Sequence, residues 1–328
     1  MATIKDIALN SGVAASTVSE VLNYKPRAKK VSEATKKRIF EAARKLNYTP
    51  NIVARGLRTG RSMQIGLLID RIEGSIFPYI IQGIEDVLYA RGYSGTFYIY
   101  RSEQDLVERA RLLKQKQVDG ILLYPDECIP SETFQTLLKD YPVVTFAKKL
   151  QNSSIPCVKV NGEKIGYLAT KYLFELGHSK IAFFCIKGKS REKGCRKALN
   201  ELGISEDRVE FLYLPHGFEE GRKAFREILE MPEVSAVYAY SDHCAAGMVY
   251  EANLMGIKIP DRLSIVGCNN LPISSQVYPP ITTINQPKSE QGSEAARMLL
   301  DMIENKSIGY DKLLAPDLIE RQSVKSVK

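Results

Sequence analysis

The sequence predicts a small all-α domain at the N-terminus, followed by an α/β core of two parallel-sheet lobes. Residues 4–46 place apolar side chains at helical spacing. From residue 65, short apolar runs alternate with helical stretches, as in repeated βαβ units. The charge divides at the same place. Residues 1–61 carry thirteen Lys and Arg against four Asp and Glu, a net of +9, and the remainder has 33 against 34, a net of −1.

The first two helical segments have the pattern of a helix-turn-helix. Apolar residues line one face of each segment, and Gly12 between them supplies a turn where a positive φ costs little. The apolar positions are Ile4, Ile7, Ala8, Val18, Val21 and Leu22. Such a motif places its second helix in a DNA major groove. Positive charge confined to this end favours that interpretation over a purely structural helical hairpin.

Three further segments complete the N-terminal region. The insert Tyr24–Lys30 carries four positive charges and a proline, and we expect it to be a loop along DNA phosphates. Ser32 is a suitable N-cap for a third helix, with Ile39, Ala42, Ala43 and Leu46 facing inward. Thr49 and Pro50 begin a short helix that ends near Arg58 and is too short to be stable alone.

This region resembles the DNA-binding headpiece of the lac repressor (LacI/GalR) family. The matching residues read T-I-K-D-I-A, S-G-V-A-A-S-T-V-S-E-V-L-N, V-S-E-A-T, I-F-E-A-A-R-K-L-N-Y and T-P-N-I-V-A-R-G-L. The resemblance implies a headpiece at residues 1–48, a hinge helix at 49–61 and a two-lobed effector-binding and dimerisation core at 62–328. In this family the hinge helix orders on DNA, and a leucine from each subunit of a dimer wedges into the minor groove.

The resemblance also implies the residues that contact DNA. Leu57 is the expected wedge, with Ala54 allowing close approach, although Leu57 could instead begin the core. The full predicted set is Thr3, Ala15, Ser16, Thr17, Ser19, Glu20, Asn23, Asn51, Ala54, Arg55, Leu57 and Arg58. Two positions depart from the family pattern. Ala14 replaces the usual serine N-cap, and Glu20 replaces a frequent arginine, so it would accept from a cytosine amino group or face water.

The core resembles the periplasmic-binding-protein-like core of the same family. Its expected strands read I-G-L-L-I-D, G-T-F-Y-I-Y, G-I-L-L-Y-P and V-V-T-F-A, then K-I-A-F-F-C-I, V-E-F-L-Y-L, A-V-Y-A-Y-S and S-I-V-G-C. The tail, P-P-I-T-T-I-N-Q-P-K through A-A-R-M-L-L-D-M-I, is expected to return to the first lobe. Further landmarks are G-H-S-K-I-A-F-F, S-D-H-C-A-A-G and L-I-E-R-Q-S.

No catalytic, cofactor or metal site is predicted. Gly188-Lys189-Ser190 resembles the end of a phosphate-binding loop, but Phe183 stands where that loop needs its first glycine. No G-x-S-x-G elbow exists, and the three histidines have no metal spacing. The six cysteines show no C-x-x-C pair and are expected to be buried free thiols. The N-terminus lacks a signal segment and no apolar run approaches a membrane span, so we expect a cytoplasmic protein.

A small effector is expected in the cleft between the lobes, where polar residues follow the strands. By family position Arg191 would fork to ligand oxygens and Phe77 would face the ligand, with core packing the alternative for Phe77. Asp242 is expected to be the N-cap of the next helix rather than a direct ligand contact. The full predicted set is Asp70, Phe77, Tyr124, Arg191, His216, Ser241, Asp242 and Asn269.

The sequence therefore predicts a homodimeric transcriptional regulator, a repressor of a pseudo-palindromic double-stranded operator, controlled by a sugar or sugar derivative. Ala147 and Asn269 stand where many relatives carry Asp, and His216 falls where a flat apolar ring is usual, so the pocket departs from the common sugar or purine type. Two alternatives stay open. A phosphorylated carrier protein could replace the small effector, or the chain could be a carbohydrate-binding receptor, which the basic headpiece opposes.

Overall fold

The computed structural model describes residues 2–22, 26–48, 60–70, 76–125, 132–139, 141–150, 153–213 and 217–328. The chain forms two compact units, Met1–Ser62 and Met63–Lys328. The predicted hinge, 49–61, lies outside the described residues except for its last two positions, so its helix and the limits drawn around it stay predictions.

The N-terminal unit is built from three α-helices and a short 3₁₀ helix among its described residues: α1 (Ile4–Ser11), α2 (Ala15–Leu22), η1 (Pro26–Lys30) and α3 (Glu33–Lys45). Gly12 takes φ 64° after α1, as predicted. The Ser32 hydroxyl accepts from the Thr35 amide at 3.3 Å, which confirms the predicted N-cap. A small core joins all four helices and contains Ile7, Val18, Val21, Ala28, Ile39, Ala42 and Ala43.

The insert after α2 differs from the prediction of a loop. Residues 26–30 form η1, and Ala28 is buried among the helices of the headpiece. The sequence contains no sign of this contact, because one small apolar residue among four cations produces no periodic pattern. Arg27, Lys29 and Lys30 remain exposed, so the basic surface that the sequence predicted is kept.

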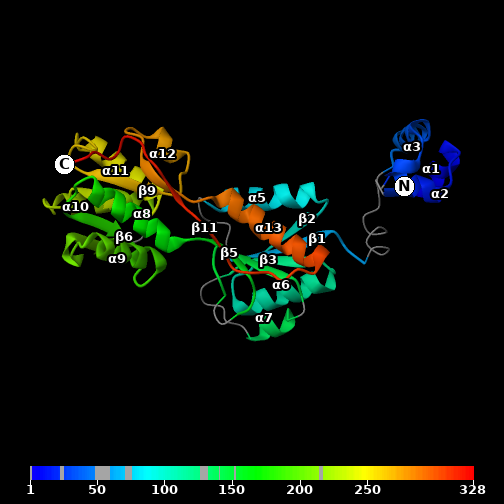
Figure 1. Ribbon diagram of the computed structural model, residues 1–328, viewed down its shortest axis with the longest axis horizontal. Coiled ribbons are helices and arrows are strands. Elements are labelled where there is room, and N and C mark those ends of the chain that lie inside the picture. The colour runs from blue at the N-terminus through cyan, green and yellow to red at the C-terminus, as the bar shows by residue number, and fades with distance from the viewer. Residues whose placement is uncertain are drawn as a thin grey trace. The chain divides into compact units, whose positions relative to one another are not determined.

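The second unit contains two six-stranded sheets. The first has the order β11-β5-β4-β3-β1-β2 and is parallel throughout. Its strands are β1 (Gln64–Ile69), β2 (Ser94–Ile99), β3 (Gly120–Tyr124), β4 (Val143–Phe146), β5 (Cys157–Val160) and β11 (Lys312–Leu314). Helices α5 (Phe77–Ala90) and α13 (Lys288–Asn305) cover one face, and α6 (Glu103–Gln115) and α7 (Glu132–Leu137) cover the other (Figure 1).

The second sheet has the order β12-β10-β9-β8-β6-β7, with only the β10–β12 pair antiparallel. Its strands are β6 (Ile181–Phe184), β7 (Val209–Leu212), β8 (Ala236–Tyr238), β9 (Ser264–Cys268), β10 (Thr282–Asn285) and β12 (Asp317–Ile319). Helices α8 (Gly162–Glu175) and α9 (Ser190–Leu202) pack on one face, and α10 (Phe218–Leu229) and α11 (Asp242–Leu254) on the other. The short η2 (Glu206–Arg208) and α12 (Ile273–Gln276) complete it.

The chain passes between the sheets three times. It leaves the first sheet after β5, returns from β10 through α13, and crosses again from β11 to β12. The predicted return of the whole tail to the first lobe is therefore wrong for residues 282–285, which form β10 in the second sheet. It is correct for α13, which packs against α5 of the first lobe (Figure 1).

The described cysteines agree with the sequence prediction. Cys157, Cys185, Cys195, Cys244 and Cys268 are free and buried, as predicted. Within the described ranges, no group of three or more His, Cys, Asp or Glu is arranged to hold a metal ion. None of the helices described is long and apolar enough to cross a membrane.

Candidate functional site

Helix α2 presents its polar residues on the side that does not pack into the headpiece. Val18 and Val21 are buried, whereas Ser16 is exposed and Thr17 and Ser19 are half-buried. Ala15 is also half-buried. This outward side has the short polar side chains that a recognition helix needs at a DNA groove.

Glu20 and Thr3 make contacts inside the headpiece. The Glu20 carboxylate lies 3.9 Å from Arg27 Nη1 of η1, a surface ion pair. Thr3 is the N-cap of α1: its hydroxyl accepts from the Asp6 amide at 3.3 Å, and its own amide donates to Asp6 Oδ2 at 2.8 Å. The Thr3 hydroxyl also donates to Asp6 Oδ2 at 2.8 Å, and this bond and the one from the Thr3 amide lower the pKa of the Asp6 carboxyl. Thr3 stays exposed, so its capping role and its predicted DNA contact are compatible.

The start of α2 lacks a side-chain cap. The Ala14 carbonyl accepts from the Val18 amide at 3.0 Å, which places Ala14 at the N-cap, but its methyl group offers no oxygen. The other predicted DNA contacts lie outside the described residues, as does one predicted effector residue. They are Asn23, Asn51, Ala54, Arg55, Leu57 and Arg58 for DNA, and His216 for the effector.

Arg191 lies at the carboxyl edge of the second sheet, in the first turn of α9. Its Nη1 donates to the Tyr240 carbonyl at 2.7 Å and to the Tyr238 hydroxyl at 3.0 Å. The guanidinium also lies 4.0 Å from the centre of the Tyr240 ring. Gly166 of α8 allows this placement, because a Cβ there would lie 1.9 Å from the Arg191 carbonyl oxygen.

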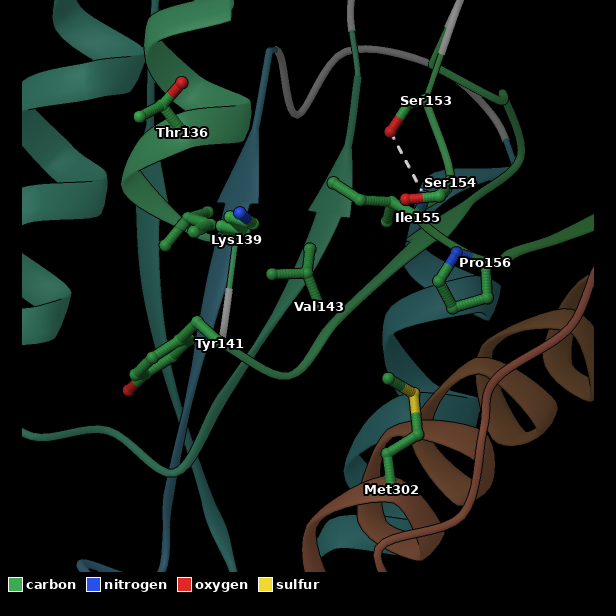
Figure 2. Close-up of a pocket in the computed structure, with 10 residues that line it drawn as sticks. Thr136, Lys139, Tyr141, Val143, Ser153, Ser154, Ile155, Pro156 and Met302 are labelled. Atoms are coloured by element: carbon green, nitrogen blue, oxygen red, sulfur yellow. Dashed lines mark hydrogen bonds between the residues drawn. The ribbon is translucent and has the colours of Figure 1, made fainter.

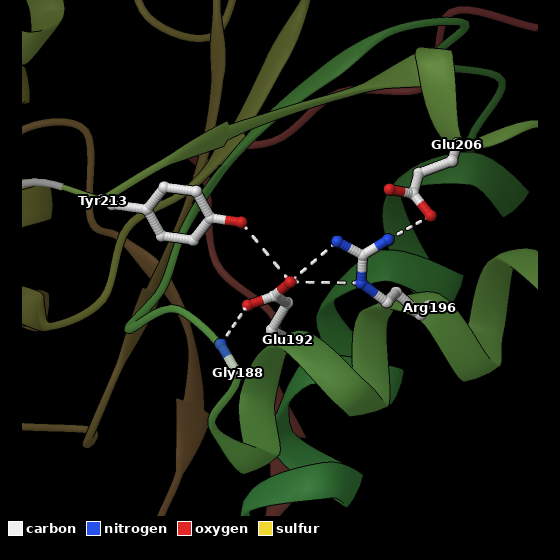
Figure 3. Close-up of polar contacts among 5 residues, drawn as sticks. All are labelled: Gly188, Glu192, Arg196, Glu206 and Tyr213. Atoms are coloured by element: carbon white, nitrogen blue, oxygen red, sulfur yellow. Dashed lines mark hydrogen bonds and ion pairs between the residues drawn. The ribbon is translucent and has the colours of Figure 1, made fainter.

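The loop before Arg191 is held by its neighbour, Glu192. Glu192 Oε2 accepts from the Gly188 amide at 2.6 Å, and Oε1 accepts from Arg196 Nη2 at 2.7 Å and from the Tyr213 hydroxyl at 3.4 Å (Figure 3). Arg196 also pairs with Glu206. Burial raises the pKa of the Glu192 carboxyl, but its hydrogen bonds outweigh this and the pKa is lowered. The carboxylate thus stays charged and ties α9 to the loops after β6 and β7.

Ser241 and Asp242 correct one prediction. Ser241, not Asp242, is the N-cap of α11, and its hydroxyl accepts from the Cys244 amide at 3.2 Å. Asp242 is 0% exposed. Its two carboxylate oxygens accept from the Leu271 amide and the Thr283 hydroxyl, each at 2.6 Å. Burial raises its pKa to about 6. These contacts give Asp242 a structural role, but not the N-cap role that the sequence predicted.

Asn269 stands beside two residues that the sequence did not single out. Its Oδ1 accepts from Gln286 Nε2 at 2.5 Å, and its carbonyl accepts from the Lys288 ammonium. Asn269 has φ 106°, a backbone conformation that turns this carbonyl toward Lys288. Gln286 and Lys288 follow β10 as Asn269 follows β9. The Q-P-K sequence after an apolar run was the signal that could have identified them.

The predicted residues of the first sheet also gather at its carboxyl edge. Asp70 follows β1, and Tyr124 ends β3. The ring of Phe77, at the start of α5, packs edge-on against Tyr124 with centroids 5.9 Å apart. Phe77 is almost fully buried in the lobe core, which favours packing as its main role. Lys148, just after β4, lies 5.2 Å from the Tyr124 ring centre.

Two cavities lie away from these edges. One, of about 370 Å³, is at the amino-terminal ends of β4 and β5, and Val143, Ile155, Pro156 and Met302 line it (Figure 2). The other, of about 220 Å³, lies between α8 and α9 and is lined by residues such as Tyr167 and Lys197. Neither contains a predicted effector residue. Arg191, Ser241 and Asn269 lie instead at the carboxyl edge of the second sheet, which is the candidate effector site.

A basic helix-turn-helix unit followed by two α/β lobes defines a DNA-binding regulator with a periplasmic-binding-protein-like core. Residues 3–51 match the model of the bacterial regulatory proteins of the lacI family, and residues 170–324 match that of the periplasmic binding protein-like domain. The HTH-type transcriptional repressor PurR of Vibrio atlanticus is 35% identical over 347 residues, covering all of both chains. The chain belongs to the lacI family and is a DNA-binding transcriptional repressor, not an enzyme.

Solved structures agree with this assignment. A transcriptional regulator CelR–cellobiose complex is 26% identical, with TM-score 0.68 over 99% of this chain and all of that one. A LacI family regulator from Enterococcus faecium with bound ribose is 27% identical, with TM-score 0.71 over 81% of this chain and all of that one. The lac repressor dimer bound to operator has TM-score 0.80 at 22% identity, over 99% of each chain, and shows the shared fold.

Proposed function

We propose that this repressor binds a pseudo-palindromic operator as a homodimer in the cytoplasm. Helix α2 would enter the major groove, with contacts from Ala15, Ser16, Thr17 and Ser19, and from Asn23 beyond it. The hinge residues Asn51, Ala54, Arg55, Leu57 and Arg58 would occupy the minor groove. The outward polar side of α2 and the net +9 charge of residues 1–61 support this arrangement. Thr3 and Glu20 would lie at its margin.

Two exposed apolar surfaces support a homodimer. On the first lobe they are Tyr89 of α5 and Phe97 and Ile99 of the edge strand β2. On the second lobe they are Tyr250 and Leu254 of α11, with Met255 and Tyr278 nearby. Apolar groups at an unpaired sheet edge and on one helix are typical of a surface that another chain covers. The solved lac repressor is itself a dimer on its operator.

The effector that we propose is a sugar or sugar derivative at the carboxyl edge of the second sheet. Arg191 carries this proposal. Its Nη1 is used by Tyr238 and Tyr240, while Nε and Nη2 make no hydrogen bond to any described residue. Those atoms carry three N–H donors that can fork to ligand oxygens. Ser241 and Asn269 add polar groups at the same edge, and relatives have been solved with cellobiose and ribose.

Effector binding would act on DNA through linked equilibria. A ligand that favours one arrangement of the two lobes shifts the operator affinity by its difference in affinity for the two arrangements. Three segments of the chain connect the two sheets, so a conformational change at the edge of the second sheet could be transmitted through them to β1 and the hinge.

The operator can be found by selecting from random DNA with the full-length chain. We expect an inverted repeat whose affinity falls steeply with salt, because Lys and Arg release counterions from the phosphates. A selected site without two-fold symmetry would contradict the dimer. Affinity that is constant between low and moderate salt would contradict the basic headpiece as the binding surface.

A further inference from the structure

A second buried cation lies at the same sheet edge as Arg191. Lys288, the first residue of α13, is 8% exposed. Its ammonium donates to the carbonyls of Asn269 and Gln286, and it lies 5.4 Å from the centre of the Tyr79 ring. An ammonium has three donors, so one is left after these two carbonyls. Lys288 forms no ion pair with any described residue, which is a costly state for a buried charge.

A chain of polar contacts joins the two cations along the edge. Arg191 donates to the Tyr238 hydroxyl, which hydrogen-bonds the Cys268 thiol. Gln286 Nε2 contacts Cys268 Sγ at 3.6 Å and Asn269 Oδ1 at 2.5 Å. The Asn269 carbonyl then accepts from Lys288. Strand β9 lies between β8 and β10, so a group over its end is one strand spacing, about 5 Å, from either neighbour.

No carboxylate among the described residues makes a direct ion pair with either cation at the second sheet's edge. Asp242 attracts Lys288 electrostatically, but its two oxygens accept from Leu271 and Thr283 and not from the ammonium, and Asn269 is neutral. Glu192 is bound to Gly188 and Arg196. On the first sheet's edge, Asp70 follows β1, and Lys148 follows β4 and faces the Tyr124 ring. Neither cation therefore makes a direct ion pair with a described carboxylate, and each keeps at least one N–H donor that an anion could use.

We propose that the effector carries a negatively charged oxygen group, a carboxylate or a phosphate, over the end of β9 between Arg191 and Lys288. This inference rests on the proposed effector site and narrows its ligand to a sugar acid or a sugar phosphate. Arg191 would bind the anion through its free N–H fork, and Lys288 would supply its remaining donor. The N-terminus of the 18-residue α13 adds positive potential at the same place.

The alternative role of Lys288 is to hold the Asn269 carbonyl in place. The two roles differ in what substitution does without ligand. If Lys288 only holds the turn, Lys288→Met should lower the melting temperature of the free protein. If its charge serves to bind an anion, removing a buried charge that has no ion pair should offset the loss of its two hydrogen bonds, so the free protein should melt at the same temperature or higher.

The test is the melting temperature of the full-length chain with glucose, glucose 6-phosphate, glucuronate or inorganic phosphate, at matched ionic strength. We expect one of the two charged sugars to stabilise the wild type more than glucose does, and which one does so distinguishes phosphate from carboxylate. In Lys288→Met the affinity should fall roughly tenfold or more, as for loss of a charge-assisted hydrogen bond. Lys288→Arg should keep the preference for the anion.

The matched control is Lys223→Met, which removes an exposed lysine of α10 in the same lobe and should keep the full shift. Inorganic phosphate also binds basic surfaces, so stabilisation by phosphate supports the proposal only if Lys288→Met removes it. The proposal is overturned if glucose stabilises as well as both charged sugars, if no anion shifts the melting temperature, or if Lys288→Met keeps the wild-type response. Because these measurements contain no DNA, a negative result would not count against the proposed operator binding.

Discussion

The guanidinium of Arg191 is bound to Tyr240 in two ways. Nη1 donates to the Tyr240 carbonyl at 2.7 Å, and the guanidinium carbon lies 4.0 Å from the centre of the same residue's ring. Tyr240, which follows β8, thus fixes both the direction and the plane of the Arg191 guanidinium. A guanidinium held in this way loses little side-chain entropy when it binds ligand oxygens through its other edge.

Replacing Arg191 with Met should abolish effector binding and leave the fold intact. Met keeps the apolar stem but removes the donors, so we expect an affinity loss of roughly a hundredfold or more. Titration calorimetry measures this affinity with the ligand that most raises the melting temperature of the wild type. Arg208→Ala removes an exposed arginine of the same lobe and should bind normally. Normal affinity in Arg191→Met would refute the assignment.

Glu192→Gln should weaken effector binding through the loop that precedes Arg191. The amide cannot accept from both Gly188 and Arg196 as the carboxylate does, so the loop loses one anchor. We expect a loss of about fivefold to tenfold in ligand affinity, with little change in unliganded operator binding. Glu206→Gln removes the other partner of Arg196 and is the control. Equal effects of the two substitutions would mean that Glu192 acts only through Arg196.

Asp242 makes the stability of the core depend on pH. Its folded pKa of about 6 exceeds the ordinary value of 3.8, so the folded state binds this proton more tightly than the unfolded state. The resulting stabilisation is present below pH 3.8 and is lost as the pH rises through about 6. The shift corresponds to about 3 kcal/mol.

Denaturant unfolding of wild type and Asp242→Asn across this range isolates the effect. Relative to the variant, the wild type should lose stability between about pH 4 and pH 6. A difference between the two proteins that does not change with pH would show that Asp242 keeps an ordinary pKa.

Ala14→Ser should stabilise α2 by about 1 kcal/mol, because serine supplies the missing cap oxygen. Hydrogen exchange at the Thr17 amide, the third residue of the helix, should slow roughly fivefold if the amide gains this bond. Ala14→Val has no oxygen and should give no protection. Equal protection in both variants would point to side-chain size rather than capping.

The sequence predicted most of the fold because long elements repeat their apolar pattern. Helix α3 and the eight predicted strands were found in this way, since burial on one or both faces leaves a periodic signal. The short strands β5, β10, β11 and β12 were missed. Lys159 interrupts β5, and β11 and β12 have three residues each, too few to show a period.

The candidate site was predicted less completely than the fold. Arg191, Ser241 and Asn269 were identified because each follows a strand of the second sheet or matches a family position. Ser241 and Asp242 are both good caps in adjacent positions, and only the structure shows that Ser241 is used. Lys288 was not predicted as a site residue, because its position depends on the tertiary arrangement. The segment that forms β10 had been assigned to the first lobe, so the sequence did not place Lys288 at the edge of the second sheet.

The most direct test of the account is operator affinity with and without ligand. Fluorescence anisotropy of the selected operator duplex would be measured for the full-length wild type and for Arg191→Met, each with the best-binding ligand. We predict that the ligand changes the wild-type affinity roughly fivefold or more and leaves the variant unchanged, in line with typical coupling free energies. An operator affinity that the ligand does not change in the wild type, or changes equally in both proteins, would contradict control of DNA binding from the carboxyl edge of the second sheet.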